Sequence, residues 1–168
     1  MGILIPANFD LRILNRSEKR VVEILRDRLS DSWKIIPHLE FATKKRSYEI
    51  DVLIFHEKYG VIGIEVKGEQ VSLQDGTWKA GKRVLEESPS VQSRNSCRAL
   101  KEKLQKKVSS LRKLKIYSAV AMPDSDDSEI DILPIDDIAE SYFFQSDLQE
   151  KTLGPRIFDF LTKVANID

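Results

Sequence analysis

The chain has 168 residues, of which 41% are hydrophobic, with 27 basic and 27 acidic side chains and a net charge of zero. This composition is typical of one globular domain and excludes intrinsic disorder, while the single Cys97 excludes an internal disulfide framework and a Cys/His zinc cluster. With no apolar run long enough to cross a bilayer, we expect one cytoplasmic domain over residues 1–168 that does not enter a membrane and binds any metal through oxygen.

The first predicted element is a helix over about residues 17–29, where apolar residues recur at helical spacing. Asn15 precedes this helix and Glu18 follows three residues later, as in a capping box. Glu18 lies four residues before Val22 and seven before Leu25, so its carboxylate shares the stripe that the helix buries. The simplest interpretation of Glu18 is a cap on the first turn.

Three segments with strand character follow, at residues 33–41, 48–55 and 61–66. Short polar turns separate them, which predicts an antiparallel meander. The dipeptide Asp75-Gly76 lies between two further apolar positions and predicts a small hairpin.

The second half of the chain begins with a long amphipathic helix pattern over about residues 89–114. Residues 115–122 form an apolar run, and after such a helical crossover this strand is expected to join the sheet in parallel. A last helix is predicted over about residues 153–164. We expect a core over about residues 15–122, followed by an acidic segment and helix over residues 123–168.

Charge is separated along the sequence although its sum is zero. Residues 94–115 carry nine basic side chains against one acidic side chain, whereas residues 123–150 carry ten acidic side chains and no lysine or arginine. A basic helix of this density either attracts a phosphate backbone or is simply a solvated helix face. The acidic segment is interpreted as a solvated loop that could shield the basic helix.

Charged groups also occur inside two of the predicted strands, which are largely apolar on both faces. Because side chains alternate along a strand, we expect Glu49, Asp51 and Leu53 on one face of the first strand. On the second strand, Glu65 and Lys67 are expected to share a face. Ionised groups in such doubly covered strands are costly unless they are paired or bind a metal.

The short turn between these strands predicts their register. If Phe55 faces Val61 across the turn, Asp51 stands opposite Glu65. Two carboxylates on directly opposed strand positions repel each other. A positive charge is therefore expected between them, from Lys67, from a divalent cation such as Mg²⁺, or from both. The alternative is an ion network of the three side chains without any ligand.

These residues form a recognisable pattern. Asp51, followed after thirteen residues by Glu65-Val66-Lys67, resembles the PD-(D/E)XK phosphodiesterase superfamily. More narrowly, several segments resemble the nuclease-related domain (NERD): Ser17-Glu18-x-x-Val21-Val22-x-x-Leu25, Ile50–Ile54, Gly60–Gly68, Gly76-x-Trp78 and Pro89-x-x-Gln92. The resemblance implies an α/β fold that is restriction-endonuclease-like, with a mixed four-stranded sheet flanked by helices in an α-β-β-β-α-β core.

The resemblance also implies roles for individual residues. Asp51, Glu65 and the backbone carbonyl of Val66 would be metal ligands. Lys67 would orient or activate the attacking water and stabilise charge that develops on the phosphate. Glu18 would complete the acidic cluster from the first helix.

Gln92, at the start of the long helix, would correspond to the glutamine that this family places near the scissile phosphate. The sequence departs from the family pattern at two positions. Ser17 replaces the usual glycine before the glutamate, and Ser88 replaces the usual asparagine before Pro89. These departures concern loop geometry and leave every implied ligand in place.

The function implied by the resemblance is a metal-dependent DNA endonuclease for DNA processing or defence against foreign DNA, with Mg²⁺ as cofactor and Mn²⁺ as a substitute. Basic residues of the turn and long helix are expected to contact the DNA backbone: Lys44, Lys45, Arg46, Arg94, Arg98 and Lys101. Two alternatives stay open, a catalytically silent DNA-binding module and a domain that docks a helicase or another DNA-processing partner. A homodimer is a further expectation.

Overall fold

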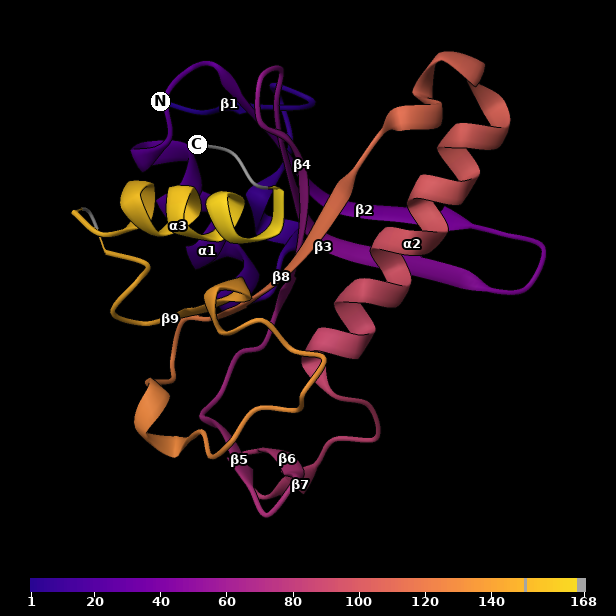
Figure 1. Cartoon of the computed structure of the whole chain (residues 1–168). Coiled ribbons are helices and arrows are strands. Elements are labelled where there is room, and N and C mark those ends of the chain that lie inside the picture. The colour runs from indigo at the N-terminus through magenta and orange to yellow at the C-terminus, as the bar shows by residue number, and fades with distance from the viewer. Residues whose placement is uncertain (150, 166–168) are drawn as a thin grey trace.

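The computed structural model describes residues 1–149 and 151–165, and its centre is a mixed six-stranded sheet with strand order β1-β2-β3-β4-β8-β9 (Figure 1). The strands of this sheet are β1 Ile3–Leu4, β2 Trp33–Ala42, β3 Ser47–His56, β4 Gly60–Val66, β8 Ile116–Met122 and β9 Tyr142–Phe144. A second, three-stranded sheet contains β5 Val71–Gln74, β6 Thr77–Ala80 and β7 Arg83–Val84. The fold is therefore α/β, as predicted.

Helices cover both faces of the main sheet (Figure 1). They are α1 Arg16–Arg28, α2 Pro89–Lys107 and α3 Leu153–Ala165, with short 3-10 turns at Leu11–Ile13, Ser109–Lys113, Asp127–Glu129 and Ala139–Ser141. α1 and α3 share one hydrophobic cluster with the sheet, and α2 packs in another. Within residues 1–149 and 151–165, no helix combines the length and hydropathy that a membrane span requires.

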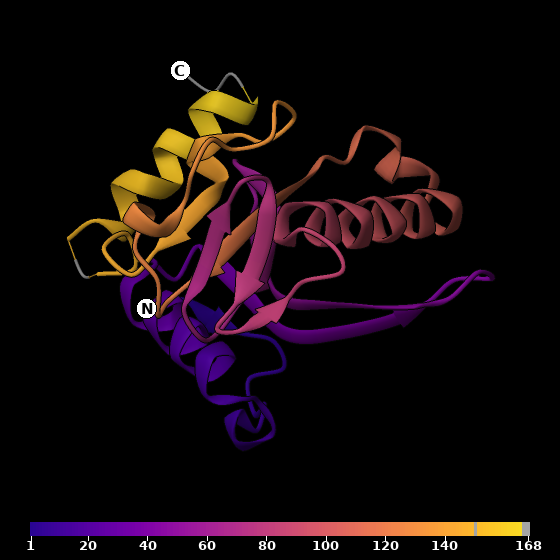
Figure 2. The same ribbon diagram turned by 90° about the horizontal axis from the view of Figure 1, so that it is seen from below.

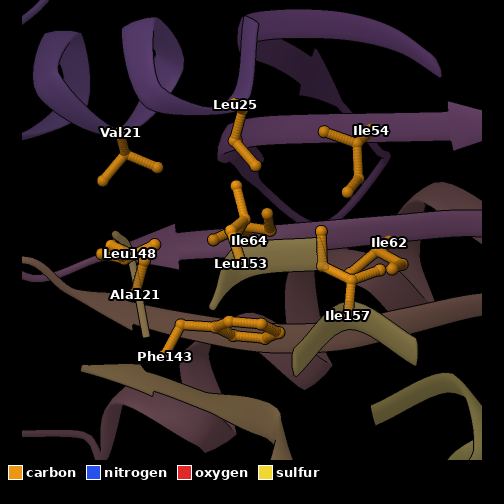
Figure 3. Close-up of a pocket in the computed structure, with 10 residues that line it drawn as sticks. All are labelled: Val21, Leu25, Ile54, Ile62, Ile64, Ala121, Phe143, Leu148, Leu153 and Ile157. Atoms are coloured by element: carbon orange, nitrogen blue, oxygen red, sulfur yellow. The ribbon is translucent and has the colours of Figure 1, made fainter. Parts of the chain in front are cut away.

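The core under α1 and α3 is closely packed. Figure 3 shows Val21 and Leu25 of α1 above Ile64 of β4, with Phe143 of β9 and Ile157 of α3 below it in the same cluster. The void between these side chains is about 10 Å³, no larger than a single water. This core holds the site in place and offers no room for a ligand.

Most predicted elements are confirmed. β2, β3 and β4 form the antiparallel meander, and β8 joins β4 in parallel after the α2 crossover. The predicted hairpin around Asp75-Gly76 is the β5–β6 turn, in which Leu73 pairs with Trp78. The capping box is also present, because the Asn15 side chain and Glu18 cap each other's backbone N–H groups at the start of α1.

Two predictions need correction. The main sheet has six strands and not four, because β1 and β9 extend it at its edges; with two and three residues, they are too short for a periodic pattern. The long helix ends at Lys107, and Val108 adopts an extended backbone and is 43% exposed. Val108 and the following Ser109 and Ser110 are weaker helix formers than the preceding lysines, which favours this end point.

The approach of α2 to the sheet depends on Gly63 in the middle of β4. A Cβ atom at this position would lie 2.4 Å from Sγ of Cys97 on α2, well inside van der Waals contact. Glycine therefore allows α2 to approach β4 closely, and Cys97 packs there as a small buried residue.

Candidate functional site

The predicted register of β3 and β4 is confirmed, since Phe55 pairs with Val61 and the ladder continues to Val52 and Ile64. Asp51 and Glu65 follow at the end of this ladder, and their residues are only 8% and 5% exposed. The Asp51 carboxylate accepts a hydrogen bond of 2.7 Å from the backbone N–H of Val66. The site thus begins where the two strands stop pairing.

The expected alternation of β3 is wrong beyond this point. Ile50 and Leu53 both pack in the hydrophobic cluster under α2, although they are three residues apart. Leu53 therefore does not share a face with Glu49 and Asp51. On the neighbouring strand, His38 has a φ of 52°, and its flanking residues pair with those on either side of Asp51. This left-handed residue interrupts the regular pleat opposite Asp51.

Next to this break in the alternation of β3, three carboxylates from two elements lie close together. Glu18 of α1 and Glu49 and Asp51 of β3 each place an oxygen within 4.8 Å of the others. Glu49 is a candidate ligand that sequence reasoning missed, although its position two residues before Asp51 on the same strand was a usable signal. Glu18 also caps α1, because its carboxylate accepts the backbone N–H of Asn15, so the predicted cap is confirmed and the same side chain lies in the acidic group.

The Glu65 carboxylate forms an ion pair with Lys67. The Lys67 ammonium lies 2.8 Å from a Glu65 carboxylate oxygen and donates a hydrogen bond of 2.8 Å to the Gln92 side-chain carbonyl. Gln92 belongs to the first turn of α2, so the structure brings together two residues to which the family resemblance assigned roles at the phosphate. The Lys67 backbone N–H donates to the Ala121 carbonyl and continues the contact between β4 and β8.

Burial and repulsion make ionisation of the Asp51 and Glu65 carboxylates unfavourable. Burial raises the pKa of Asp51 to about 8, and repulsion from Glu65, Glu18 and Glu49 acts in the same direction. Burial also raises the pKa of Glu65, against the opposing attraction of Lys67. A bound cation would relieve this repulsion, and carboxylate oxygens are the protein ligands that Mg²⁺ prefers. Glu18, Glu49 and Asp51 therefore fit a hard divalent cation.

A second group adjoins the first through Glu49. The His38 ring contacts Glu49 at 3.4 Å through Nδ1 and Glu40 at 3.2 Å through Nε2. This group is more open to solvent, since the Glu40 side chain is 69% exposed. His38 thus also contacts Glu49, one of the three grouped carboxylates.

The loop after β4 fixes the position of α1 relative to the site. A Cβ atom on Gly68 would lie 2.4 Å from Oγ of Ser17, so only glycine allows this approach. Asp124 also contacts α1, through an ion pair of 3.0 Å with Arg20 and a hydrogen bond of 3.4 Å from the Ser17 hydroxyl. Ser17 is therefore accommodated next to Glu18 and leaves the carboxylate in place.

The residues expected to contact DNA are spread over two elements. Lys44, Lys45 and Arg46 are exposed at the tip of the β2–β3 hairpin, which extends from the sheet as an arm (Figure 2). Arg98 is exposed and Lys101 half-buried on α2. Arg94 differs, because its guanidinium forms an ion pair of 2.9 Å with Asp137.

Among known proteins, the chain matches the model of one family. Neither a curated protein nor a solved structure matches the chain. The family model of the nuclease-related domain (NERD) matches residues 14–134, a range that contains α1, the meander, α2 and β8. The chain therefore belongs to the nuclease-related domain family.

Proposed function

We propose that this protein is a Mg²⁺-dependent deoxyribonuclease that hydrolyses phosphodiester bonds. The observation that carries the proposal is the convergence of Glu18, Glu49 and Asp51 near an ammonium group, Lys67, which Glu65 and Gln92 hold in place. Membership of a nuclease-related family supports the same chemistry.

In this proposal Glu18, Glu49 and Asp51 hold the cation. Glu65 and the backbone carbonyl of Val66, which the resemblance implies as ligands beside Asp51, stay proposed as further ligands, and Glu65 is also paired with Lys67. The bound metal would act as a Lewis acid and lower the pKa of a water molecule, which would provide a nucleophile at neutral pH. Asp51 is oriented for this role by the Val66 N–H bond.

Lys67 provides a fixed positive charge next to the Glu65 carboxylate. Its side chain is 21% exposed, so it is shielded from bulk water yet open to a substrate. An ammonium held by two hydrogen-bond acceptors is preorganised to stabilise negative charge that develops on a phosphate oxygen. Gln92 keeps the ammonium in place and offers its amide group to the same phosphate.

We also propose that α1, β2, β3, β4, α2 and β8 correspond to a restriction-endonuclease-like core, with β1 and β9 as additions at the sheet edges. The substrate is proposed to be DNA, contacted along its backbone by the tip of the β2–β3 arm and by the exposed basic side of α2. Arg46 lies over the Tyr48 ring at 4.5 Å, which keeps this guanidinium at the arm. Such contacts are independent of sequence and weaken with salt.

Nicking of supercoiled plasmid DNA tests the proposal. With Mg²⁺, the wild-type protein should convert the plasmid to open circles, and EDTA should stop the reaction. Asp51→Asn removes a proposed ligand and Lys67→Ala removes the fixed charge, so each should slow nicking by about a hundredfold or more. Glu57→Gln, in the exposed turn between β3 and β4, is the matched control and should retain wild-type activity.

The outcomes separate the possible functions. Nicking that is undiminished in both Asp51→Asn and Lys67→Ala would contradict the proposed roles. Binding of DNA by the wild-type protein without metal-dependent nicking would instead support a catalytically silent DNA-binding module.

A further inference from the structure

One carboxylate of the acidic segment after β8, that of Asp137, is buried within the protein. The Asp137 side chain is only 1% exposed, although the neighbouring Asp136 is exposed. Both Asp137 oxygens accept the Ser90 hydroxyl, at 2.9 and 3.0 Å. Asp137 also accepts Nη1 of Arg94 at 2.9 Å and the Tyr142 hydroxyl at 2.5 Å. It is therefore a fully engaged buried anion within a segment that the sequence presents as a solvated loop.

These contacts are made with the beginning of α2. Ser90 and Arg94 are four residues apart, so they lie on one face of the helix. Gln92 is two residues from each of them and so points from the opposite side, where it accepts the hydrogen bond from Lys67. Asp137 thus holds the turn of helix that carries Gln92.

The same turn is fixed to the sheet by a separate bond. The Ser93 hydroxyl donates to the Ala119 carbonyl of β8 at 3.0 Å. Only a small cavity of about 60 Å³ remains between this part of α2, β8 and the segment around Asp136. The first turns of α2 are consequently held between β8 and the buried anion, with little freedom to shift.

We propose that Asp137 is a positioning residue for the reaction. By holding Ser90 and Arg94 it sets the place of Gln92, and through Gln92 it sets the place of the Lys67 ammonium. The effect on catalysis rests on the proposed function, whereas the effect on Lys67 does not. The acidic segment thereby contributes to the site through one buried residue, while its exposed acids remain in solvent.

Asp147→Asn provides a matched control for a merely structural role. Asp147 lies in the same acidic segment, forms an ion pair of 2.8 Å with Arg156 of α3, and accepts the backbone N–H of Phe144. Its loss should loosen α3 and β9 in the way that loss of Asp137 loosens the segment before η4, the turn Ala139–Ser141. Its contacts are with α3 and β9, so the proposal predicts no effect on Lys67.

The experiment compares Asp137→Asn, Ser90→Ala and Asp147→Asn in two measurements. The first is the NMR signal of the Lys67 side-chain Cε in the metal-free protein, assigned by its loss in Lys67→Ala. The second is the steady-state kinetics of DNA nicking. Ser90→Ala is included because it removes one donor and leaves Asp137 paired with Arg94 and Tyr142, so the protein should fold even if Asp137→Asn does not.

The Lys67 signal should move in Asp137→Asn and in Ser90→Ala, and stay in place in Asp147→Asn. In the kinetics, Asp137→Asn should lower kcat by about tenfold or more with KM changed by less than about twofold, because a misplaced group affects the reaction more than binding. An unchanged Lys67 signal in whichever of Asp137→Asn and Ser90→Ala folds would overturn the proposal. If the signal moves but the wild-type protein nicks no DNA, the positioning role stands and the proposed function fails.

Discussion

The metal-free protein should lose stability as the pH rises through neutrality, and Asp51 is the main reason. The pKa of Asp51 is raised to about 8 in the folded protein by burial and by neighbouring carboxylates, whereas an unfolded aspartate has its ordinary pKa near 4. Between these two values the folded protein binds a proton that the unfolded chain has released. Stability is therefore fully present below about pH 4 and is lost as the pH rises toward 8.

The expected size follows from one proton per molecule. One pH unit in this window lowers the free energy of unfolding by about 1.4 kcal/mol, so the change from pH 5 to pH 7 is about 2.7 kcal/mol. The raised pKa of Glu65 acts with the same sign. Asn at position 51 keeps an acceptor for the Val66 N–H but cannot ionise, so Asp51→Asn should remove most of this slope.

Urea denaturation at pH 5, 6, 7 and 8 in EDTA measures the effect directly. The wild-type protein and the control Glu57→Gln should show the same falling free energy of unfolding, and Asp51→Asn a much flatter profile. Saturating Mg²⁺ should flatten the wild-type profile, because the cation favours the ionised carboxylates. A wild-type stability that does not change over this range, or an equal slope in Asp51→Asn, would refute the reasoning.

Three further predictions follow from close contacts and charge. Gly68→Ala places a Cβ atom 2.4 Å from Ser17 Oγ and should lower nicking activity by displacing the start of α1, whereas adding Ser17→Gly should restore it in the same assay. In Gly63→Ala, the new Cβ atom lies 2.4 Å from Cys97 Sγ, which should lower the free energy of unfolding by about 1–3 kcal/mol in urea denaturation. A smaller loss of stability in the double variant Gly63→Ala, Cys97→Gly would show that this contact is the cause. Neutralising the three basic residues 44–46 should weaken DNA binding in EDTA. It should also reduce the slope of log Kd against log salt concentration by about three. An unchanged slope would exclude the arm from the interface.

The sequence was sufficient for the part of the fold that local signals determine. A short turn and apolar strands predicted that Phe55 pairs with Val61, and this pairing placed Asp51 and Glu65 at the same end of the ladder. The crossover rule likewise predicted that β8 joins β4 in parallel. By contrast, β1 and β9 owe their existence to neighbouring strands, because two or three residues carry no periodic pattern of their own.

The site was predicted less completely. His38 adopts a left-handed backbone conformation that no local sequence pattern indicates, so the break in the alternation of β3 was not predicted, although the spacing of Glu49 and Asp51 on one strand did indicate that they lie close together. Asp137 is separated from Ser90 by 47 positions, and only the folded chain shows that it is buried. The same contact explains why Arg94, which was expected to contact DNA, is paired within the protein.

The most direct test of the central claim is a crystal structure with Mn²⁺, measured at a wavelength at which manganese scatters anomalously. We expect an anomalous peak at coordinating distance from the carboxylates of Glu18, Glu49 and Asp51, together with a Lys67 ammonium still bound to Glu65. The absence of a peak there at saturating Mn²⁺, or a peak held only by His38 and Glu40, would contradict it.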